Sequence, residues 1–273
     1  MVAMDAKHVA QERFGRYAAS YVTSRHHAGG SDLERLTELA GHHPGWVALD
    51  IATGGGHTAL AVAPHVARVV ATDITAPMLE AAREFVLGSG FALQQPANVD
   101  FQLADAEDLP FPACSFDLVT CRIAAHHFPD PARFVAEVAR VLQPSGLFLL
   151  QDQVTPEDPG AATWLTGFEK RRDPSHVRAL SGPQWLALLG SSGFSVETED
   201  RFEKRLRLVK WVADQGGTPE DLAELRAWLR QAPRAVQDWM HPTDIETDEA
   251  RFSIHHCLFS AHKTGLGDLG AGC

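Results

Sequence analysis

Positive charge, cysteine and tyrosine are scarce in this sequence, and each shortage excludes a class of protein. The 273 residues include 24 lysines and arginines against 35 aspartates and glutamates, which gives a formal net charge of −11. Nucleic-acid binding needs a basic face that neutralises phosphates, so we expect no nucleic-acid partner. No run approaches about 18 consecutive apolar residues, so we also expect no membrane partner.

The four cysteines lie far apart, and no two of them form a C-x-x-C pair. Such cysteines are typical of buried or incidental thiols in a reducing compartment. The N-terminus also lacks the charged and then apolar segment of a secretory signal, so we expect a cytoplasmic protein. His255 and His256 fall on a predicted strand, where they would face opposite sides, and we therefore expect no metal site.

One glycine-rich stretch stands out, between residues 47 and 61. An apolar run over 47–51 stops at Gly54, Gly55 and Gly56 and passes directly into an Ala/Leu/Val segment with helical spacing. This order predicts a strand, a tight turn and the start of a helix. Glycines let a backbone approach a ligand closely, and the free N–H groups of a helix N-terminus point into the same space. The stretch therefore predicts a nucleotide-binding turn.

The next predicted strand, over 66–73, ends in Asp73, where a carboxylate would accept hydrogen bonds from the two hydroxyls of a ribose. Turn and acid together predict an adenosine-type ligand. The spacing Gly54-x-Gly56-x-x-Ala59 also fits the dinucleotide fingerprint. An NAD enzyme and an S-adenosylmethionine (SAM) enzyme are therefore both open at this point.

Strand and helix patterns alternate over the first 150 residues. Strands are predicted at 47–51, 66–73, 99–103, 116–121 and 147–150, with helical patterns between them. Alternation at this spacing indicates βαβ units with right-handed crossovers. We predict an α/β fold with a doubly wound, Rossmann-like, mostly parallel seven-stranded sheet, an antiparallel last strand, N-terminal helices and a helical cap insertion.

Changes in this pattern give the expected domain boundaries. Ser31 or Asp32 is expected to cap a helix over 33–40. Beyond about residue 155 the alternation weakens, and prolines such as Pro159 and Pro183 interrupt it. The expected segments are an N-terminal helical lid over 1–44, a ligand-binding α/β core over 45–203, a helical cap over 204–240, a last strand over 241–263 and a disordered tail over 264–273.

Ordered motifs between residues 47 and 150 match a known family. They are Asp50-x-Ala52-x-Gly54-x-Gly56, Asp73, Ala104-Asp105-Ala106-Glu107-Asp108-Leu109-Pro110-Phe111, Ser115-Phe116-Asp117-Leu118-Val119, His126-His127-Phe128-x-Asp130 and Val141-Leu142-x-Pro144-x-Gly146. The chain resembles the class I SAM-dependent methyltransferases, and among them the branch of the ubiquinone and menaquinone biosynthesis methyltransferases. It departs from the family pattern at Ala52 and Ser145, where glycines are usual.

The resemblance implies S-adenosyl-L-methionine as the cofactor and gives roles to the glycine turn and its neighbours. The turn from Ala52 to Gly56, with Thr53 and Gly54, would lie along the methionine and the ribose. Asp50 would face the ammonium side of the cofactor. Asp73 would bind both ribose hydroxyls.

The resemblance also implies a set of adenine contacts. Ile74 and Met78 would pack on the adenine face, although plain core packing is an equal alternative for both. Asp105 would accept a hydrogen bond from the exocyclic amine, and the N–H of Ala106 would donate to a ring nitrogen. The remaining residues expected to bind the cofactor are Tyr21, which would cover it, Glu107, and Arg122, which would border it through its backbone.

Methyl transfer is an in-line displacement that needs alignment, exclusion of water and sometimes a base. His126 and His127 follow the predicted strand 116–121, and an imidazole titrates near neutral pH. We predict His126 as the general base and His127 as a supporting residue on the substrate side. His176 and Arg178 are predicted to contact an oxygen-bearing substrate, and a capped turn is the alternative for them.

Two other functions compete with a methyltransferase. The only tyrosines, Tyr17 and Tyr21, precede the glycine turn, so the Tyr-x-x-x-Lys arrangement of short-chain dehydrogenases cannot follow it. This disfavours an NAD-dependent oxidoreductase. A protein that binds SAM for cyclisation or regulation, without methylation, stays open. For a methyltransferase we expect a small-molecule substrate methylated on carbon, oxygen or nitrogen, and a homodimer is compatible with the sequence.

Overall fold

The structure is a computed structural model that describes residues 2–23, 29–88 and 98–264, with side chains in the first range from Ala6 to Ala18. Apart from Thr264, the predicted tail lies outside the described residues, and so does the side chain of Tyr21. None of the described helices is long and apolar enough to cross a membrane.

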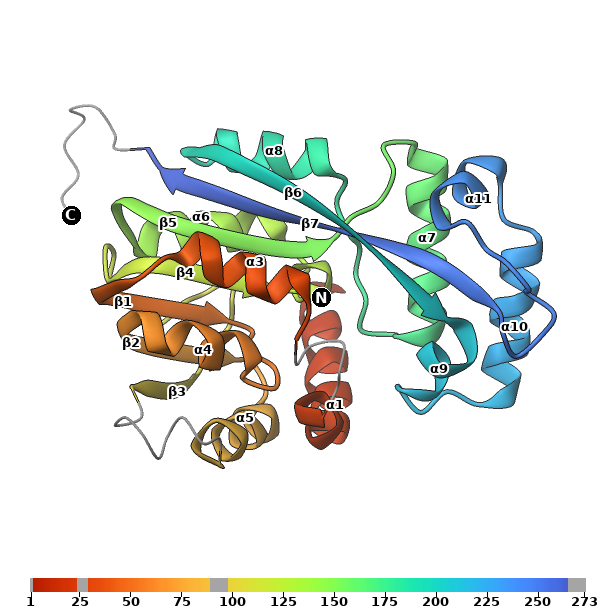
Figure 1. Ribbon diagram of the computed structural model, residues 1–273, viewed down its shortest axis with the longest axis horizontal. Helices are drawn as coiled ribbons and strands as arrows, with labels where there is room; N and C mark the ends of the chain where they lie inside the picture. The colour runs from red at the N-terminus through yellow and green to blue at the C-terminus, as the bar shows by residue number, and fades with distance from the viewer. Residues whose placement is uncertain (1, 24–28, 89–97, 265–273) are drawn as a thin grey trace.

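A single mixed sheet forms the centre of the described chain (Figure 1), and its strands follow the order β3-β2-β1-β4-β5-β7-β6. Every neighbouring pair from β3 to β5 is parallel, whereas β7 runs antiparallel to both β5 and β6. This arrangement confirms the predicted doubly wound sheet with an antiparallel last strand. The seven strands of the described residues are β1 His43–Ile51, β2 Val66–Asp73, β3 Val99–Leu103, β4 Phe116–Arg122, β5 Leu142–Gln153, β6 Phe194–Arg207 and β7 Arg251–Lys263.

Helices cover both faces of this sheet. On one face, Phe134 and Val138 of α6 and Trp185 of α8 pack against apolar side chains of β1, β4 and β5. On the other face, Leu36 of α3 and Ala59 of α4 pack against β1, β2 and β4. The helices around the sheet are α1 Val2–Thr23, α3 Ser31–Ala40, α4 His57–Val62, α5 Ala76–Gly88, α6 Pro131–Val141 and α8 Gly182–Ser191.

A second apolar core joins the cap helices to the end of the sheet. Phe168, Trp211, Leu225, Val236 and Phe252 meet in this core. Figure 1 shows the cap beyond the crossing of β6 and β7, which extend past the other strands and carry it. The strand expected around residues 193–198 continues to residue 207, so the cap helices after it begin at residue 208. The cap helices are α7 Pro159–Arg172, α9 Leu208–Ala213, α10 Pro219–Arg230 and α11 Arg234–Met240.

Pro159 and Pro183, which were expected to interrupt the pattern, each begin a helix instead. Pro159 is in the first turn of α7, where the side chain of Asp158 accepts the N–H of Ala161 at 2.7 Å. Pro183 similarly lies in the first turn of α8, behind the capping box of Ser181. Proline suits these positions because the first-turn N–H groups have no partner within the helix. Each of these prolines therefore begins a helix.

Asp32 was expected as a helix cap, and the structure gives it a different place. The helix α3 has Gly30 at its N-cap and no side-chain cap. Asp32 is buried, and its Oδ2 accepts hydrogen bonds from Arg122 at 2.9 Å, Lys204 at 2.9 Å and Gln151 at 2.8 Å. Burial raises the pKa of Asp32, but the positive charges of Arg122 and Lys204 more than offset it and hold the pKa well below its ordinary value.

The cysteines differ from one another in state. Cys121 and Cys257 are buried free thiols, as expected. Cys114 is disulfide-bonded, which the spacing of cysteines in the sequence did not indicate.

Candidate active site

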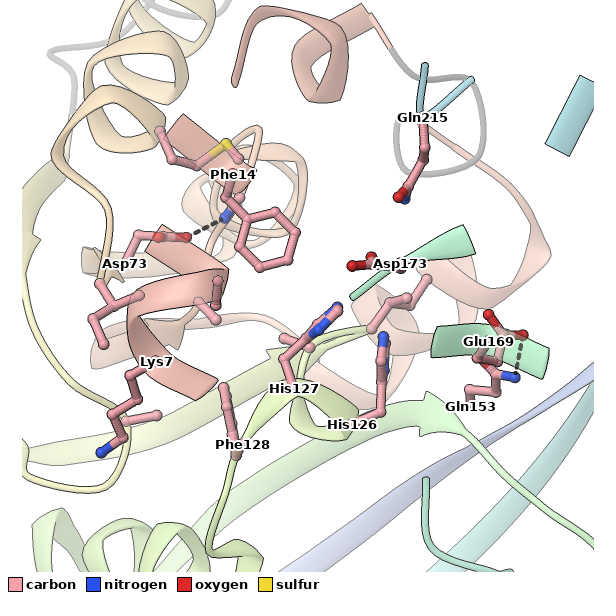
Figure 2. A pocket seen from close by; sticks show the side chains of 18 of the residues that line it. Lys7, Phe14, Asp73, His126, His127, Phe128, Gln153, Glu169, Asp173 and Gln215 are labelled. Carbon is pink, nitrogen blue, oxygen red and sulfur yellow. Dashed lines mark hydrogen bonds between the residues drawn. The ribbon is translucent and has the colours of Figure 1, made fainter. Parts of the chain in front are cut away.

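A cavity of about 220 Å³ opens at the carboxyl ends of the parallel strands. It is lined from three directions: by the loops after β1, β2, β3 and β4, by α1, and by α7, α9 and the extended strands β6 and β7. Figure 2 shows His126 and His127 near its middle, with Asp73 and Lys7 on one side and Glu169 and Gln153 on the other. We call the part lined by α1 and the loops after β1, β2 and β3 the core end, and the part lined by α7, α9, β6 and β7 the cap end.

The glycine turn forms one wall of the core end. Ala52, Gly54 and Gly56 all have positive φ angles, of 53°, 53° and 82°. A Cβ on Gly56 would lie 3.1 Å from Val86 and 3.3 Å from Ala82, so glycine is needed there for close packing of α4 against α5. Ala52 adopts a left-handed conformation that glycine accepts at no steric cost, which is a physical reason for the glycine usual in the family.

Asp73 ends β2 and lines the cavity beside this turn. Its Oδ2 accepts the backbone N–H of Gly54 at 3.2 Å, and its Oδ1 accepts the N–H of Thr75 at 3.0 Å. Burial raises the pKa of Asp73 to about 6, although these N–H groups lower it in part. Above that pH the group is an anchored, buried hydrogen-bond acceptor.

Asp50 and Thr53 lie behind the turn and are not among the residues that line the described cavity. The Asp50 carboxylate accepts hydroxyl hydrogen bonds from Thr53 and Thr120, both at 2.6 Å. Burial raises the pKa of Asp50 to about 6, against the opposing effect of the two hydroxyls. The turn is also held by Thr53, whose N–H donates to the Thr72 carbonyl at 2.7 Å. These contacts hold the turn in shape from the side that faces away from the cavity.

A short acidic segment after β3 forms the next wall. Asp105, Ala106 and Glu107 all line the cavity. Lys7 of α1 reaches both acids, with its Nζ 2.6 Å from Asp105 Oδ2 and 2.6 Å from Glu107 Oε2. Glu107 is 4% exposed, and its Oε1 accepts the N–H of Asp130 at 2.6 Å. Glu107 therefore connects the segment after β3 with α1 and with the residue that precedes α6. The two ion pairs of Lys7 hold α1 against the core end.

Apolar side chains complete the core end. Ile74 and Met78 line the cavity, and Met78 is 1% exposed. Ala10 and Phe14 face them from α1, on the helix face that also carries Lys7. The core end is thus a slot with apolar walls and acids at its rim.

Arg122 ends β4 but is not among the residues that line the cavity. Its side chain turns beneath α3 to Asp32, and its Nε donates to Gln151 at 2.9 Å. The next residue, Ile123, lines the cavity in its place and has a φ of 55°. The family resemblance predicted that the backbone of Arg122 would border the cofactor, but its neighbour Ile123 lines the cavity at this place.

His126 lies between the two ends of the cavity, on the 3-10 turn 125–127. Its Nδ1 is 2.7 Å from Oδ1 of Asp152, a residue that sequence analysis missed. Burial lowers the pKa of His126, but the negative charge of Asp152 and its hydrogen bond outweigh that effect, so the pKa is raised. Nothing in the sequence pairs these two residues, because Asp152 lies within the apolar strand β5.

The other predicted substrate residues divide between the cavity and the surface. His127 lines the cavity, its Nδ1 lies 3.0 Å from the Ser175 carbonyl, and burial lowers its pKa to about 4. His176 is buried beside His126, with ring centroids 5.1 Å apart. Neither His176 nor Arg178 is among the lining residues, and the side chain of Arg178 is exposed. Only the backbone N–H of Arg178 reaches this region, donating to the His126 carbonyl at 3.1 Å.

The cap end contains polar residues that sequence analysis did not single out. Glu169 is 3% exposed and accepts a hydrogen bond from Gln153 at 3.0 Å. The guanidinium of Arg172 lies 4.1 Å from the ring centre of Trp211. The sequence carried no signal for these residues, because strand register and the packing of the cap helices bring them together. The other lining residues of the cap end are Asp173, Lys204, Leu206, Asp214, Gln215, Ile254 and His256.

Among the described residues, no group of three His, Cys, Asp or Glu side chains is placed to hold a metal ion. His255 and His256 do point differently, as alternation predicts: His256 lines the cavity, while His255 lies 2.8 Å from the Trp239 carbonyl.

Comparison with known proteins identifies the family and supports the fold. A family profile described as "Methyltransferase domain" matches residues 49–150. The uncharacterized methyltransferase YcgJ of Bacillus subtilis (strain 168) is 39% identical over 208 residues, which span 76% of this chain and 80% of YcgJ.

Solved structures agree with this match over most of the chain. The crystal structure of YcgJ superposes with a TM-score of 0.78 at 33% identity, over 85% of this chain and 98% of that one. BH2331 from Bacillus halodurans C-125 gives a TM-score of 0.80 at 38% identity, over 86% of this chain and 100% of that one. The chain belongs to the class I SAM-dependent methyltransferase family.

Proposed function

We propose that this protein transfers the methyl group of SAM to a small-molecule acceptor, with the nucleoside at the core end and the acceptor at the cap end. One observation carries the proposal: the glycine turn, Asp73 and Asp105 come from three neighbouring strands and line one cavity that continues past His126 into the cap. Ligands of open α/β sheets bind at this edge.

The residues of the core end fit an adenosine group. Asp73 is held by two backbone N–H groups in a position to accept both ribose hydroxyls. Ile74 and Met78 supply apolar surface for a base, and Asp105 supplies an acceptor for its exocyclic amine. The backbone of Ala52 and Gly54 borders the space for the methionine, while Asp50 supports that turn through Thr53.

SAM, when bound, supplies an electrophilic methyl group on a sulfonium. The protein then has to align the acceptor, exclude water and receive a proton where the acceptor carries one. Phe14 and Trp211 close the cavity from α1 and α9. His126 and His127 both lie between the two ends, and we propose His126 as the base.

The acceptor is proposed to be a small molecule because the cavity lies between core and cap and the chain carries a net charge of −11. A thermal-shift assay tests the cofactor: S-adenosylhomocysteine should raise the melting temperature, and NAD should not. A radiolabelled-SAM assay against phenols, quinols and amines tests the reaction. Stabilisation by NAD alone would overturn the proposal, and so would SAM binding without label transfer to any acceptor in cell extract.

A further inference from the structure

Asp152 is a buried carboxylate that directly contacts His126. It is 1% exposed and lies near the end of β5, where its Oδ1 also accepts the backbone N–H of Gln153 at 2.9 Å. A carboxylate 2.7 Å from Nδ1 of His126 accepts a hydrogen bond from that nitrogen, so Nδ1 carries the proton. The neutral ring then has its free lone pair on Nε2. Because the ring lines the cavity, Nε2 is available as a base (Figure 2).

The groups around His126 favour protonation of this ring over its neighbours. Burial lowers the pKa of His126, and Asp152 with two further acids raises it above the ordinary value. Burial holds the pKa of His127 at about 4 and that of His256 at about 3, so both rings stay neutral near pH 7. The titratable groups that face His126 are Asp152 on β5, Glu169 on α7, Asp173 after α7, His127 on the same turn, His176 after it and His256 on β7.

We propose that His126 and Asp152 form a base dyad and that the acceptor is a hydroxyl compound, an inference that rests on the proposed function. Asp152 is a positioning residue that holds Nδ1–H, and Nε2 of His126 removes the hydroxyl proton. The oxygen lone pair forms the new O–CH3 bond, the S–CH3 bonding pair stays on sulfur as a neutral thioether, and the proton ends on Nε2. The positive charge thereby moves from the sulfonium to an imidazolium beside the Asp152 carboxylate.

The cap end suits a hydroxyl better than an ammonium group. Glu169 already accepts hydrogen bonds from Gln153 and Arg172, and Asp173 forms an ion pair with Arg13 at 3.0 Å. Each of these carboxylates is already paired with an arginine of the protein, so a protonated amine would have to share a negative charge that is largely compensated.

The remaining walls describe the skeleton that carries the hydroxyl. Phe14, Leu206, Trp211 and Ile254 present apolar surface to the same cavity as His126. A weakly acidic hydroxyl, such as one on an aromatic ring, loses its proton to an imidazole more readily than an alkyl hydroxyl does. The geometry therefore points to a weakly acidic hydroxyl on an apolar skeleton.

The first test needs no substrate. In the full-length 15N-labelled protein, the His126 Nδ1–H proton should give a downfield NMR signal, identified by its loss in His126→Gln. In Asp152→Asn that signal should disappear or move upfield, and the titration midpoint of His126 should fall by about one pH unit. Asp238→Asn, which removes an exposed carboxylate paired with Arg234, should change neither. An unchanged His126 midpoint in Asp152→Asn would refute the dyad.

The second test compares acceptors of one skeleton. With SAM, 4-methylphenol, whose hydroxyl keeps its proton near pH 7, should be methylated in preference to 4-methylaniline and 4-methylbenzylamine. Asp152→Asn should lower kcat on 4-methylphenol by about ten- to a hundredfold with little change in KM, and the acidic limb of the pH profile should move to lower pH. Preferential methylation of either amine would overturn the hydroxyl assignment. If none of the three reacts, the hydroxyl assignment is rejected for aromatic skeletons, and the NMR result alone decides the dyad.

Binding of S-adenosylhomocysteine separates the two proposals. Asp152→Asn should bind it as tightly as the unaltered chain, because Asp152 is not among the cavity-lining residues. Failure of the unaltered chain to bind it would refute the proposed function. Binding with preferential amine methylation would refute only the dyad's assignment to a hydroxyl.

Discussion

The backbone N–H of Gly54 donates to Oδ2 of Asp73 at 3.2 Å, and this hydrogen bond joins the glycine turn to the end of the neighbouring strand. The other oxygen of Asp73 accepts the N–H of Thr75. Both contacts are with the backbone of the loops after β1 and β2, so these loops set the orientation of the carboxylate. Under the proposed function, this side chain would lose little freedom on binding a ribose, which would favour affinity.

Asp73→Ala should weaken the binding of S-adenosylhomocysteine by about ten- to a hundredfold. Hydrogen bonds to a charged acceptor contribute about 1.5–3 kcal/mol, and each 1.4 kcal/mol corresponds to about a factor of ten. Isothermal titration calorimetry measures the change. Asp100→Ala is the matched control, because Asp100 lies on adjacent β3 and makes an exposed ion pair with Arg68. Equal affinity in Asp73→Ala would show that this carboxylate does not bind the nucleoside.

The affinity for S-adenosylhomocysteine should rise with pH between 5 and 7.5. Because burial raises the pKa of Asp73 to about 6, the carboxylate is largely protonated at pH 5 and ionised at pH 7.5. Only the ionised form keeps a lone pair on each oxygen for a ribose hydroxyl in addition to the N–H groups of Gly54 and Thr75. The gain should not exceed about tenfold, since one pH unit below a pKa leaves about a tenth of the group ionised.

Two variants identify the group responsible for this pH dependence. Asp73→Asn should bind more weakly at pH 7.5 and show a flatter profile. Asp50 also has a pKa raised by burial to about 6, but its oxygens bind Thr53 and Thr120 away from the cavity. Asp50→Asn should therefore keep the profile. If only Asp50→Asn had a flat profile, the pH dependence of the affinity would come from Asp50 beneath the glycine turn and not from Asp73.

Sequence patterns predicted the core end of the site because its residues follow strand ends. Asp73 and Asp105 each come at or just after a strand, and parallel strands bring their carboxyl ends to one edge. Lys7 and Asp152 had no such signal. Lys7 meets Asp105 across 98 residues, and Asp152 meets His126 across 26. These contacts depend on helix docking and on strand register, which local patterns do not specify.

The cap end was unpredictable for a related reason. Lys204 and His256 share the cavity because β6 pairs with β7 in one register, with Phe202 opposite His256 and Lys204 opposite Ile254. A shift of β6 by one residue would turn Lys204 to the face opposite His256. The sequence predicted β6 only to residue 198, so this shared face was outside any expected strand pair.

Ala52→Gly should stabilise the protein by about 0.5–1 kcal/mol. A φ of 53° costs a residue with a Cβ about 1–2 kcal/mol, and glycine at this position would avoid that cost. Glycine also has more freedom in the unfolded chain, which offsets part of the stabilisation. Urea denaturation measures the change. Ala59→Gly is the matched control: Ala59 lies within α4, and glycine there should destabilise by about 1 kcal/mol. Equal destabilisation by both substitutions would show that the conformation of Ala52 carries no strain.

The buried Asp32 depends on cations from two strands. Arg122 is on β4 and Lys204 is on β6, and their nitrogens lie 2.9 Å from the same oxygen of Asp32. The Asp32 and Arg122 side chains are 2% and 3% exposed, whereas Lys204 is 23% exposed at the cavity. Lys204 keeps some contact with solvent, whereas Arg122 is buried with Asp32. Loss of Arg122 should therefore leave the negative charge of Asp32 less well compensated than loss of Lys204 would.

Arg122→Met should lower the free energy of unfolding by about 3 kcal/mol, because it removes the buried cation and leaves the buried Asp32 carboxylate with the partly exposed Lys204 as its remaining charged partner. The double variant Arg122→Met/Asp32→Leu should recover at least half of the loss, since it removes that charge as well. Urea denaturation measures both, and S-adenosylhomocysteine affinity should be nearly unchanged in Arg122→Met, whose altered side chain is not among those lining the cavity. A double variant as unstable as Arg122→Met would assign the loss to packing beneath α3. A large loss of affinity with normal stability would instead place the Arg122 side chain in cofactor binding.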